Sequence, residues 1–187
     1  MFIFLIVLAA FVVAIVLFII GIYNALIKLK IDAEGSWSDI DTQLKRRFDL
    51  IPNLVETVKG YAAHESQVFE EVARARSQAM QASGPAATAQ AEAGLTGALK
   101  SLFAVAENYP QLKADANFMQ LQTTLNEIED HINKARRYYN AVVREYNTKL
   151  QVFPNNIVAS LFTFPPKDFF ELDSEEERKN VKVDFAK

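Results

Sequence analysis

The chain of 187 residues carries 20 basic and 23 acidic residues and contains no cysteine. A formal net charge of −3 excludes a nucleic-acid partner, because such binding needs a concentrated basic face. The lack of cysteine excludes disulfides, thiol nucleophiles and zinc–thiolate sites. Only six glycines and six prolines, with many Ala, Leu, Glu, Lys and Gln residues, favour helices over sheets.

The N-terminus is the most apolar part of the chain. Residues 2–20 contain no charged or hydrogen-bonding side chain, and at about 1.5 Å per residue they reach across the roughly 30 Å hydrocarbon core of a bilayer. A cleaved signal peptide is disfavoured, because no basic residue precedes this run and no Ala-x-Ala motif closes it. We predict a retained transmembrane anchor over residues 1–27.

Basic residues follow the predicted span, and none precedes it. Lys28 and Lys30 come at once, and a second basic group begins at Lys45. The positive-inside bias then predicts a single-pass protein of the cell membrane, with the N-terminus outside and the soluble domain in the cytoplasm.

Apolar residues three or four positions apart predict four helical segments. Their apolar stripes run from Leu26 to Ile51, from Leu54 to Ala75, from about Ala86 to Ala106, and from Phe118 to Tyr146. The fourth stripe is the most regular and is typical of a helix packed in a bundle. We predict an all-α protein, with an N-terminal transmembrane helix followed by an elongated antiparallel four-helix bundle.

Proline and glycine residues mark the predicted breaks. No clear stop signal ends the anchor helix, and Pro52 either kinks the first bundle helix or lies in the first turn of the second. Ser-Gly-Pro at 83–85, Asn-Tyr-Pro at 108–110 and Pro154 end the next three helices. Residues 155–164 suit a short apolar helix.

The C-terminal residues differ from the bundle in pattern. Two prolines at 165–166 stop the helical pattern, and Val181, Val183 and Phe185 alternate with charged residues as in a strand. The predicted domains are therefore the anchor (1–27), the bundle (28–164) and an extended tail (165–187) that docks on the bundle or on a neighbouring molecule.

No catalytic or metal-binding pattern is present in the sequence. The chain has two histidines, and neither His64 nor His131 follows a glutamate by three residues, as di-metal sites in helical bundles require. There is no Gly-x-Ser-x-Gly motif and no glycine-rich phosphate loop. We predict that the protein is not an enzyme and has no cofactor, metal or small-molecule substrate. A metal-dependent enzyme of unrecognised type is the weakest alternative.

The segment that begins at Trp37 is the densest in distinctive residue types. One interpretation places Trp37 in the core and assigns Lys45, Arg46 and Arg47 to ion pairs. In the other, the three cations face phospholipid headgroups or an acidic patch of a partner. An upright helix would carry them about 25 Å above the membrane. At that distance the attraction to headgroups is screened, which weakens the interpretation that these cations face lipid.

A second distinctive run covers residues 135–147 and includes Arg136 and Arg137. Asn140 and Asn147 lie beside the apolar stripe, and buried hydrogen bonds from these amides would fix the register of the helices.

The two distinctive runs closely resemble the LemA family. The resemblance extends from residues 37–55 through 56–62 and His64-Glu65 to residues 135–147, Phe-Pro-Asn-Asn at 153–156 and Val-Lys-Val-Asp-Phe at 181–185. It covers nearly the whole soluble part, and the anchor is also a family feature. It implies a bacterial inner-membrane protein with a cytoplasmic antiparallel helical bundle. It brings no established activity, cofactor or catalytic residue.

Family associations favour a role in assembly. Some relatives are associated with building magnetosome membranes, and others are encoded near membrane-bound proteases. We therefore expect a non-enzymatic membrane-anchored scaffold or adaptor that forms a homo-oligomer or binds another membrane protein. The alternative is a lipid-contacting, membrane-shaping protein that uses basic residues on a rigid helical rod. The candidate interaction residues are Trp37, Lys45, Arg46, Arg47, Arg136, Arg137 and Phe185.

Overall fold

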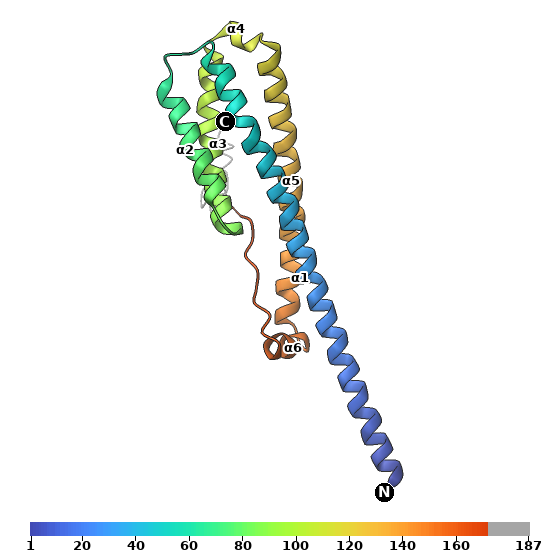
Figure 1. Ribbon diagram of the computed structural model, residues 1–187. Coiled ribbons are helices and arrows are strands. Elements are labelled where there is room, and N and C mark those ends of the chain that lie inside the picture. Colours follow the sequence, from blue (N-terminus) through green and yellow to red (C-terminus); the bar gives the residue numbers. More distant parts are fainter. Residues whose placement is uncertain (172–187) are drawn as a thin grey trace, which may run out of the picture. The chain divides into compact units, whose positions relative to one another are not determined.

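The computed structural model describes residues 1–171, and all regular secondary structure in that range is helical (Figure 1). The predicted all-α class with a long apolar N-terminal helix is confirmed. The strand-like segment around Phe185 lies outside the described residues. In chain order the helices of residues 1–171 are α1 (Phe2–Lys59), α2 (Ser66–Gln81), α3 (Pro85–Glu107), α4 (Pro110–Lys113), α5 (Ala116–Gln151) and α6 (Asn155–Leu161).

The helices fall into two compact units. The first unit consists of Met1–Leu50 and Gln120–Phe169, and so holds most of α1, most of α5, and α6 with the segment after it. The second unit contains Ile51–Met119 and the last two described residues, Phe170 and Glu171. It holds the end of α1, α2 to α4, and the start of α5.

Helix α1 is 58 residues long and does not stop where the predicted span ends. It also continues through Pro52, so this residue lies inside the first bundle helix, and the alternative that it opens a second helix was wrong. A proline inside a helix costs about 3 kcal/mol, because it removes one backbone hydrogen bond and crowds the preceding turn. Ile51 and Leu54, on either side of Pro52, are fully buried. Tertiary packing of this kind, rather than helix propensity, stabilises most protein helices.

The prediction of one helical segment from Leu54 to Ala75 was wrong. Helix α1 ends at Lys59, and α2 begins only at Ser66. Between them the amide of Ala62 donates to the carbonyl of Val58 at 2.9 Å, and Ala62 is buried. Residues on both sides of this turn are buried, so the apolar spacing continues across it as it would in a single helix.

In the first unit, α1 and α5 run antiparallel and bury their apolar stripes (Figure 1). The predicted stripe on α5 included Val142, but the buried residue at this point is Val143, whereas Tyr139 and Tyr146 on either side are buried as predicted. The buried apolar residues of these two helices within the unit include Leu26, Ala33, Ile40, Leu44, Leu125, Ile128, Ile132, Tyr139, Val143 and Tyr146.

The second unit is built around the antiparallel pair of α2 and α3. Pro85 lies in the first turn of α3, where its missing N–H has no helical partner to lose. Helix α2 buries Phe69 and Val72, and α3 buries Leu95 and Leu102. The short helix α4 was not predicted, because a four-residue helix has no measurable periodicity.

Helix α6 lies within the residues 155–164 for which a short helix was predicted, and it ends in a Schellman motif. The amide of Phe164 donates to the carbonyl of Ala159 at 3.0 Å, and that of Thr163 donates to the carbonyl of Ser160 at 3.3 Å. Thr163 has a φ of 55°, in the left-handed region where glycine is usual and β-branched residues are rare.

Candidate functional site

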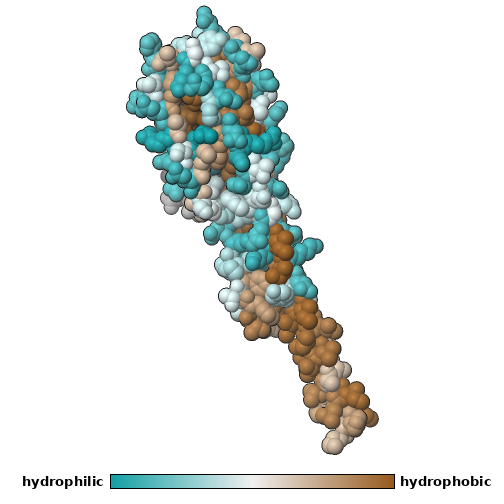
Figure 2. Space-filling view, in the orientation of Figure 1, coloured by the Kyte–Doolittle hydropathy of each residue, from teal (hydrophilic) through white to brown (hydrophobic). Residues whose placement is uncertain are grey.

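Among the described residues, one helix, α1, is long and apolar enough to cross a membrane. Every residue from Phe2 to Phe18 is exposed, and the first partly covered residue is Ile19. Figure 2 shows this part of α1 as a continuous apolar surface. The other segments of the first unit thus begin to cover α1 where the uncharged run of residues 2–20 ends. This pattern indicates a membrane localisation.

Trp37 packs against α5. Its ring lies 5.4 Å from the ring of Tyr139, centroid to centroid, with an angle of 56° between the planes. The Trp37 side chain is half-buried, and Tyr139 is buried. Aromatic pairs with this spacing and tilt stabilise a core beyond the area they bury. The structure therefore supports the interpretation of Trp37 as a packing residue.

The three predicted cations do not share one surface. Arg47 is only 6% exposed, and its Nη1 lies 3.1 Å from Oε2 of Glu129 on α5. Lys45 and Arg46 are exposed, and Arg46 donates to the amide oxygen of Gln43 at 3.3 Å. Arg47 is three residues after one buried leucine and four before a buried isoleucine, so it belongs to the core-facing stripe. The structure therefore assigns Arg47 to an ion pair, as the first of the two interpretations predicts.

The two arginines of the second run also point to different environments. Arg136 is half-buried, and its Nη2 donates to Oδ1 of Asn133, one turn earlier on α5, at 3.1 Å. Arg137 and its neighbour Tyr138 are exposed. Among the described candidate residues, Lys45, Arg46 and Arg137 are therefore the cations on the surface. Phe185 lies outside the described residues.

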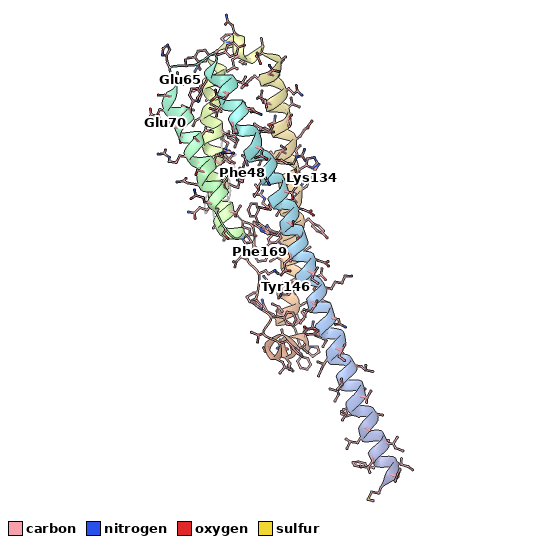
Figure 3. The ribbon with its side chains drawn as sticks, in the orientation of Figure 1. Phe48, Glu65, Glu70, Lys134, Tyr146 and Phe169 are labelled. Carbon is pink, nitrogen blue, oxygen red and sulfur yellow. The ribbon has the colours of Figure 1, made fainter. Side chains whose placement is uncertain are left out.

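Two tyrosines of α5 bind the backbone of the segment that follows α6. The Tyr146 hydroxyl donates to the carbonyl of Pro165 at 2.9 Å, and the Tyr139 hydroxyl donates to the carbonyl of Asp168 at 2.8 Å. The tyrosines are seven residues apart, so they lie two turns apart on one face of α5. Figure 3 labels Tyr146 on this helix.

Asn147 adds two further hydrogen bonds to the same segment. Its Nδ2 donates to the carbonyl of Lys167 at 2.8 Å, and its Oδ1 accepts from the amide of Lys167 at 3.0 Å. The Lys167 ammonium also lies 3.2 Å from Oε1 of Glu34 on α1. We call Tyr139, Tyr146 and Asn147, with the backbone of residues 165–168, the C-terminal clamp. It fastens the end of the first unit to α5.

The electrostatics of the clamp keep both hydroxyls protonated. Burial, followed by the charge of Asp168, raises the pKa of Tyr139 to about 12. Burial, followed by the charge of Glu34, also raises the pKa of Tyr146 above its usual value of 10.0. Both phenols therefore stay hydrogen-bond donors throughout the physiological pH range.

The clamp was not predicted from the sequence. Asn147 was predicted to fix the register between helices through buried hydrogen bonds, but it binds an extended backbone segment instead. The signal available in the sequence was Tyr139, Tyr146 and Asn147 within one distinctive run. Their acceptors are main-chain carbonyls, which no side-chain pattern reveals.

A separate polar cluster in the second unit is explained by helix capping. Oδ1 of Asp115 accepts from the amide of Phe118 at 2.9 Å, which caps the start of α5, and the Tyr61 hydroxyl donates to its Oδ2 at 3.0 Å. Hydrogen bonds from the Phe118 amide and then from the Tyr61 hydroxyl lower the pKa of Asp115.

The two histidines do not form part of a metal site within the described residues. His64 and His131 are both exposed, and residues 1–171 contain no group of three or more His, Cys, Asp or Glu side chains placed to hold a metal.

Comparison with known proteins finds several similar sequences. Magnetosome protein MamQ 2 of Paramagnetospirillum magneticum is 26% identical in an alignment of 175 residues, and the match covers 80% of this chain and 64% of that protein. Magnetosome protein MamQ of Magnetospirillum gryphiswaldense is 26% identical in an alignment of 174 residues, and the match covers 79% of this chain and 64% of the relative. Protein LemA of Metamycoplasma hominis is 26% identical in an alignment of 144 residues, and the match covers 75% of this chain and 64% of the relative.

The chain spans less than two thirds of the length of these relatives, 64% in each case. A sequence profile of the LemA family matches residues 36–185, which include α1 from Ser36 onward, α2 to α6 and both parts of the C-terminal clamp. The chain therefore belongs to the LemA family.

Proposed function

We propose that the protein is a non-enzymatic, membrane-anchored scaffold or adaptor whose helical domain associates with itself or binds another membrane protein. The observation that carries this proposal is the continuity of α1, which includes the apolar span and also the helix that packs on α5. The span and the packed part of the first unit are therefore one stiff element. A flexible linker, which would let a domain sample many orientations, is absent from residues 2–59 of α1.

The C-terminal clamp supports the same proposal. It holds residues 165–168 on α5 and α1, so the first unit presents a fixed surface close to the membrane. A fixed surface loses little conformational entropy on association, which favours binding. Named relatives include magnetosome proteins, which fits a role in membrane-bound assembly.

The placement of the basic residues does not favour the alternative of a membrane-shaping protein that uses Lys45, Arg46 and Arg47 to contact lipid. Arg47 is buried against Glu129, which leaves Lys45 and Arg46 as the exposed cations of that group. Lys45 follows Ile20 by 25 residues, about 37 Å along a helix, so attraction to headgroups would be screened.

Site-specific photo-crosslinking of the full chain in its native membrane tests the scaffold proposal. A photoreactive residue at exposed Lys45 or Arg137 should give discrete larger species, either self-linked or joined to one recurrent membrane protein. The same residue at buried Val143 is the control and should give none. If correctly inserted protein gives no larger species from any exposed position on α1 or α5, the proposal fails.

We also propose that the helical domain lies in the cytoplasm. The support is Lys28 and Lys30, which directly follow the span. Because the chain has no cysteine, a single Arg137→Cys variant can report its side of the membrane. A membrane-impermeant maleimide should label this variant only after the cells are opened. Labelling of intact cells would reverse the assigned orientation.

A further inference from the structure

The residues around α6 form an uncharged surface in an otherwise charged part of the chain. Residues 152–166 contain no charged side chain, although Lys149 and Lys167 flank them. Contiguous apolar surface of this kind marks an interaction site, whereas single exposed apolar residues are ordinary. We call the exposed apolar side chains of this region the α6 patch; they are Val152, Phe153, Ile157, Leu161 and Phe162.

The most exposed members of the patch are large. Phe153 is 79% exposed, Leu161 69% and Ile157 58%. Ile157 and Leu161 are four residues apart, so they lie together on the exposed face of α6. At 100° per residue, Asn156 and Ser160 occupy the other side of that exposed face. The exposed half of α6 is therefore itself divided into an apolar and a polar side.

The patch lies directly beside the end of the apolar span. The ring of Phe162 packs edge-on against Tyr23 of α1, with the centroids 4.8 Å apart, and the ring of Phe164 lies 5.6 Å from the same tyrosine. Tyr23 follows Ile20, the last residue of the uncharged run, by three positions, or about 4.5 Å along the helix. The end of α6 is thus at the level of the headgroup layer when residues 2–20 fill the hydrocarbon core.

We propose that the α6 patch is a second membrane-contact surface, seated in the boundary between the headgroups and acyl chains beside the span. An amphipathic segment in this position lies in the plane of the membrane, with its apolar side buried about 5–10 Å into that boundary. Ile157, Leu161 and Phe153 enter the lipid, while Asn156 and Ser160 remain among the headgroups.

The occupant is lipid because the patch adjoins a lipid-facing surface. The nearly continuous run of exposed apolar residues at the start of α1 ends at Ile20, and Phe162, an exposed apolar residue at the end of α6, packs on Tyr23 just beyond it. The flanking Lys149 has a long side chain that would place its ammonium group among lipid phosphates while its stem stays in apolar surroundings, whereas Lys167 is paired with Glu34. This inference does not depend on the scaffold proposal, since it requires no protein partner.

Depth-dependent fluorescence quenching tests this contact on the full-length protein. The cysteine-free chain allows single variants Ile157→Cys, Leu161→Cys and Phe153→Cys, each labelled with a polarity-sensitive fluorophore. Matched controls are Ser160→Cys on the polar side of α6 and Arg137→Cys on the exposed surface of α5. The protein is reconstituted in vesicles of phosphatidylcholine with phosphatidylglycerol, and the quenchers are a nitroxide on the upper acyl chain and aqueous iodide.

The expected result is a blue-shifted label at positions 157, 161 and 153, quenched by the lipid nitroxide and severalfold less accessible to iodide than the label at position 137. The label at position 160 should fall between these two cases. Iodide access at the patch equal to that at position 137 would overturn the proposal. Protection from both quenchers would also overturn it, because protein would then cover the patch. Phe153 precedes α6, so its variant gives a valid reading even where a label within α6 disturbs that helix.

Discussion

Substituting Asn147 by alanine should release residues 165–168 from α5. This side chain makes two hydrogen bonds to the backbone of Lys167, one as a donor at 2.8 Å and one as an acceptor at 3.0 Å. Alanine removes both bonds but keeps the helical backbone. Asn126→Ala is a matched control, because Asn126 is an exposed asparagine on the part of α5 that lies in the same unit.

The size of the effect follows from the two lost bonds. Each contributes about 1 kcal/mol net, so the local opening of this segment should become about 2 kcal/mol easier, or roughly 30-fold more frequent. Alanine has a higher helix propensity than asparagine by several tenths of a kcal/mol. The Asn126→Ala control measures this opposing gain in the same helix.

Hydrogen exchange resolved at the Lys167 amide, which donates to Asn147, reads this opening directly in detergent-solubilised protein. Exchange there should rise by about the stated factor in Asn147→Ala and stay near wild type in Asn126→Ala. The single tryptophan, Trp37, reports unfolding of the first unit, because it packs on Tyr139. Equal exchange at Lys167 in both variants would refute the clamp.

Three further predictions concern stability, each measured by denaturation with Trp37 fluorescence as the reporter. Arg47→Ala should destabilise the first unit by about 2 kcal/mol, because it leaves a carboxylate without its cation, whereas Arg46→Ala should change stability by less than about 0.5 kcal/mol; equal effects would contradict the assigned burial. Thr163→Gly should stabilise the protein by about 0.5–1 kcal/mol, since glycine adopts the left-handed conformation without steric cost, and a loss of stability would show that the threonine side chain matters more than its backbone. Because the pKa of Tyr139 is raised from 10.0 to about 12, its contribution is complete below pH 10 and is lost as the pH rises through 12; Tyr139→Phe should flatten the pH dependence in that window, and an unchanged slope would count against the assigned pKa.

The helices could be predicted from the sequence where one face of a helix is buried. The stripes of α1 and α5 follow the three–four spacing because packing alone determines which residues are apolar there. The same rule explains two errors. The stripe from Leu54 to Ala75 crosses a turn whose residues also face a core, and Val143 replaces Val142 because the drift of a real helix cannot be read to one residue.

The candidate site was harder to predict because its interactions depend on tertiary contacts. Arg47 appeared as one of three consecutive basic residues, but its partner Glu129 lies 82 residues later in the sequence. The clamp joins side chains to main-chain carbonyls, which are present in every residue and so carry no sequence signal. The exposed apolar side of α6 was equally hidden, since periodicity cannot distinguish a face that meets lipid from one that meets protein.

Because α1 is unbroken, the thickness of the bilayer also affects where the first unit lies above the membrane. A span that is longer or shorter than the local hydrocarbon layer adjusts by tilting. Leu50, the last α1 residue of the first unit, follows Ile20 by 30 residues, or about 45 Å along the helix axis. A change in tilt of about 10° would therefore move Leu50 sideways by about 8 Å, as the far end of a lever moves. Thinner and thicker regions of one membrane would then place this end of the first unit at different lateral positions without any change in the contacts within the unit.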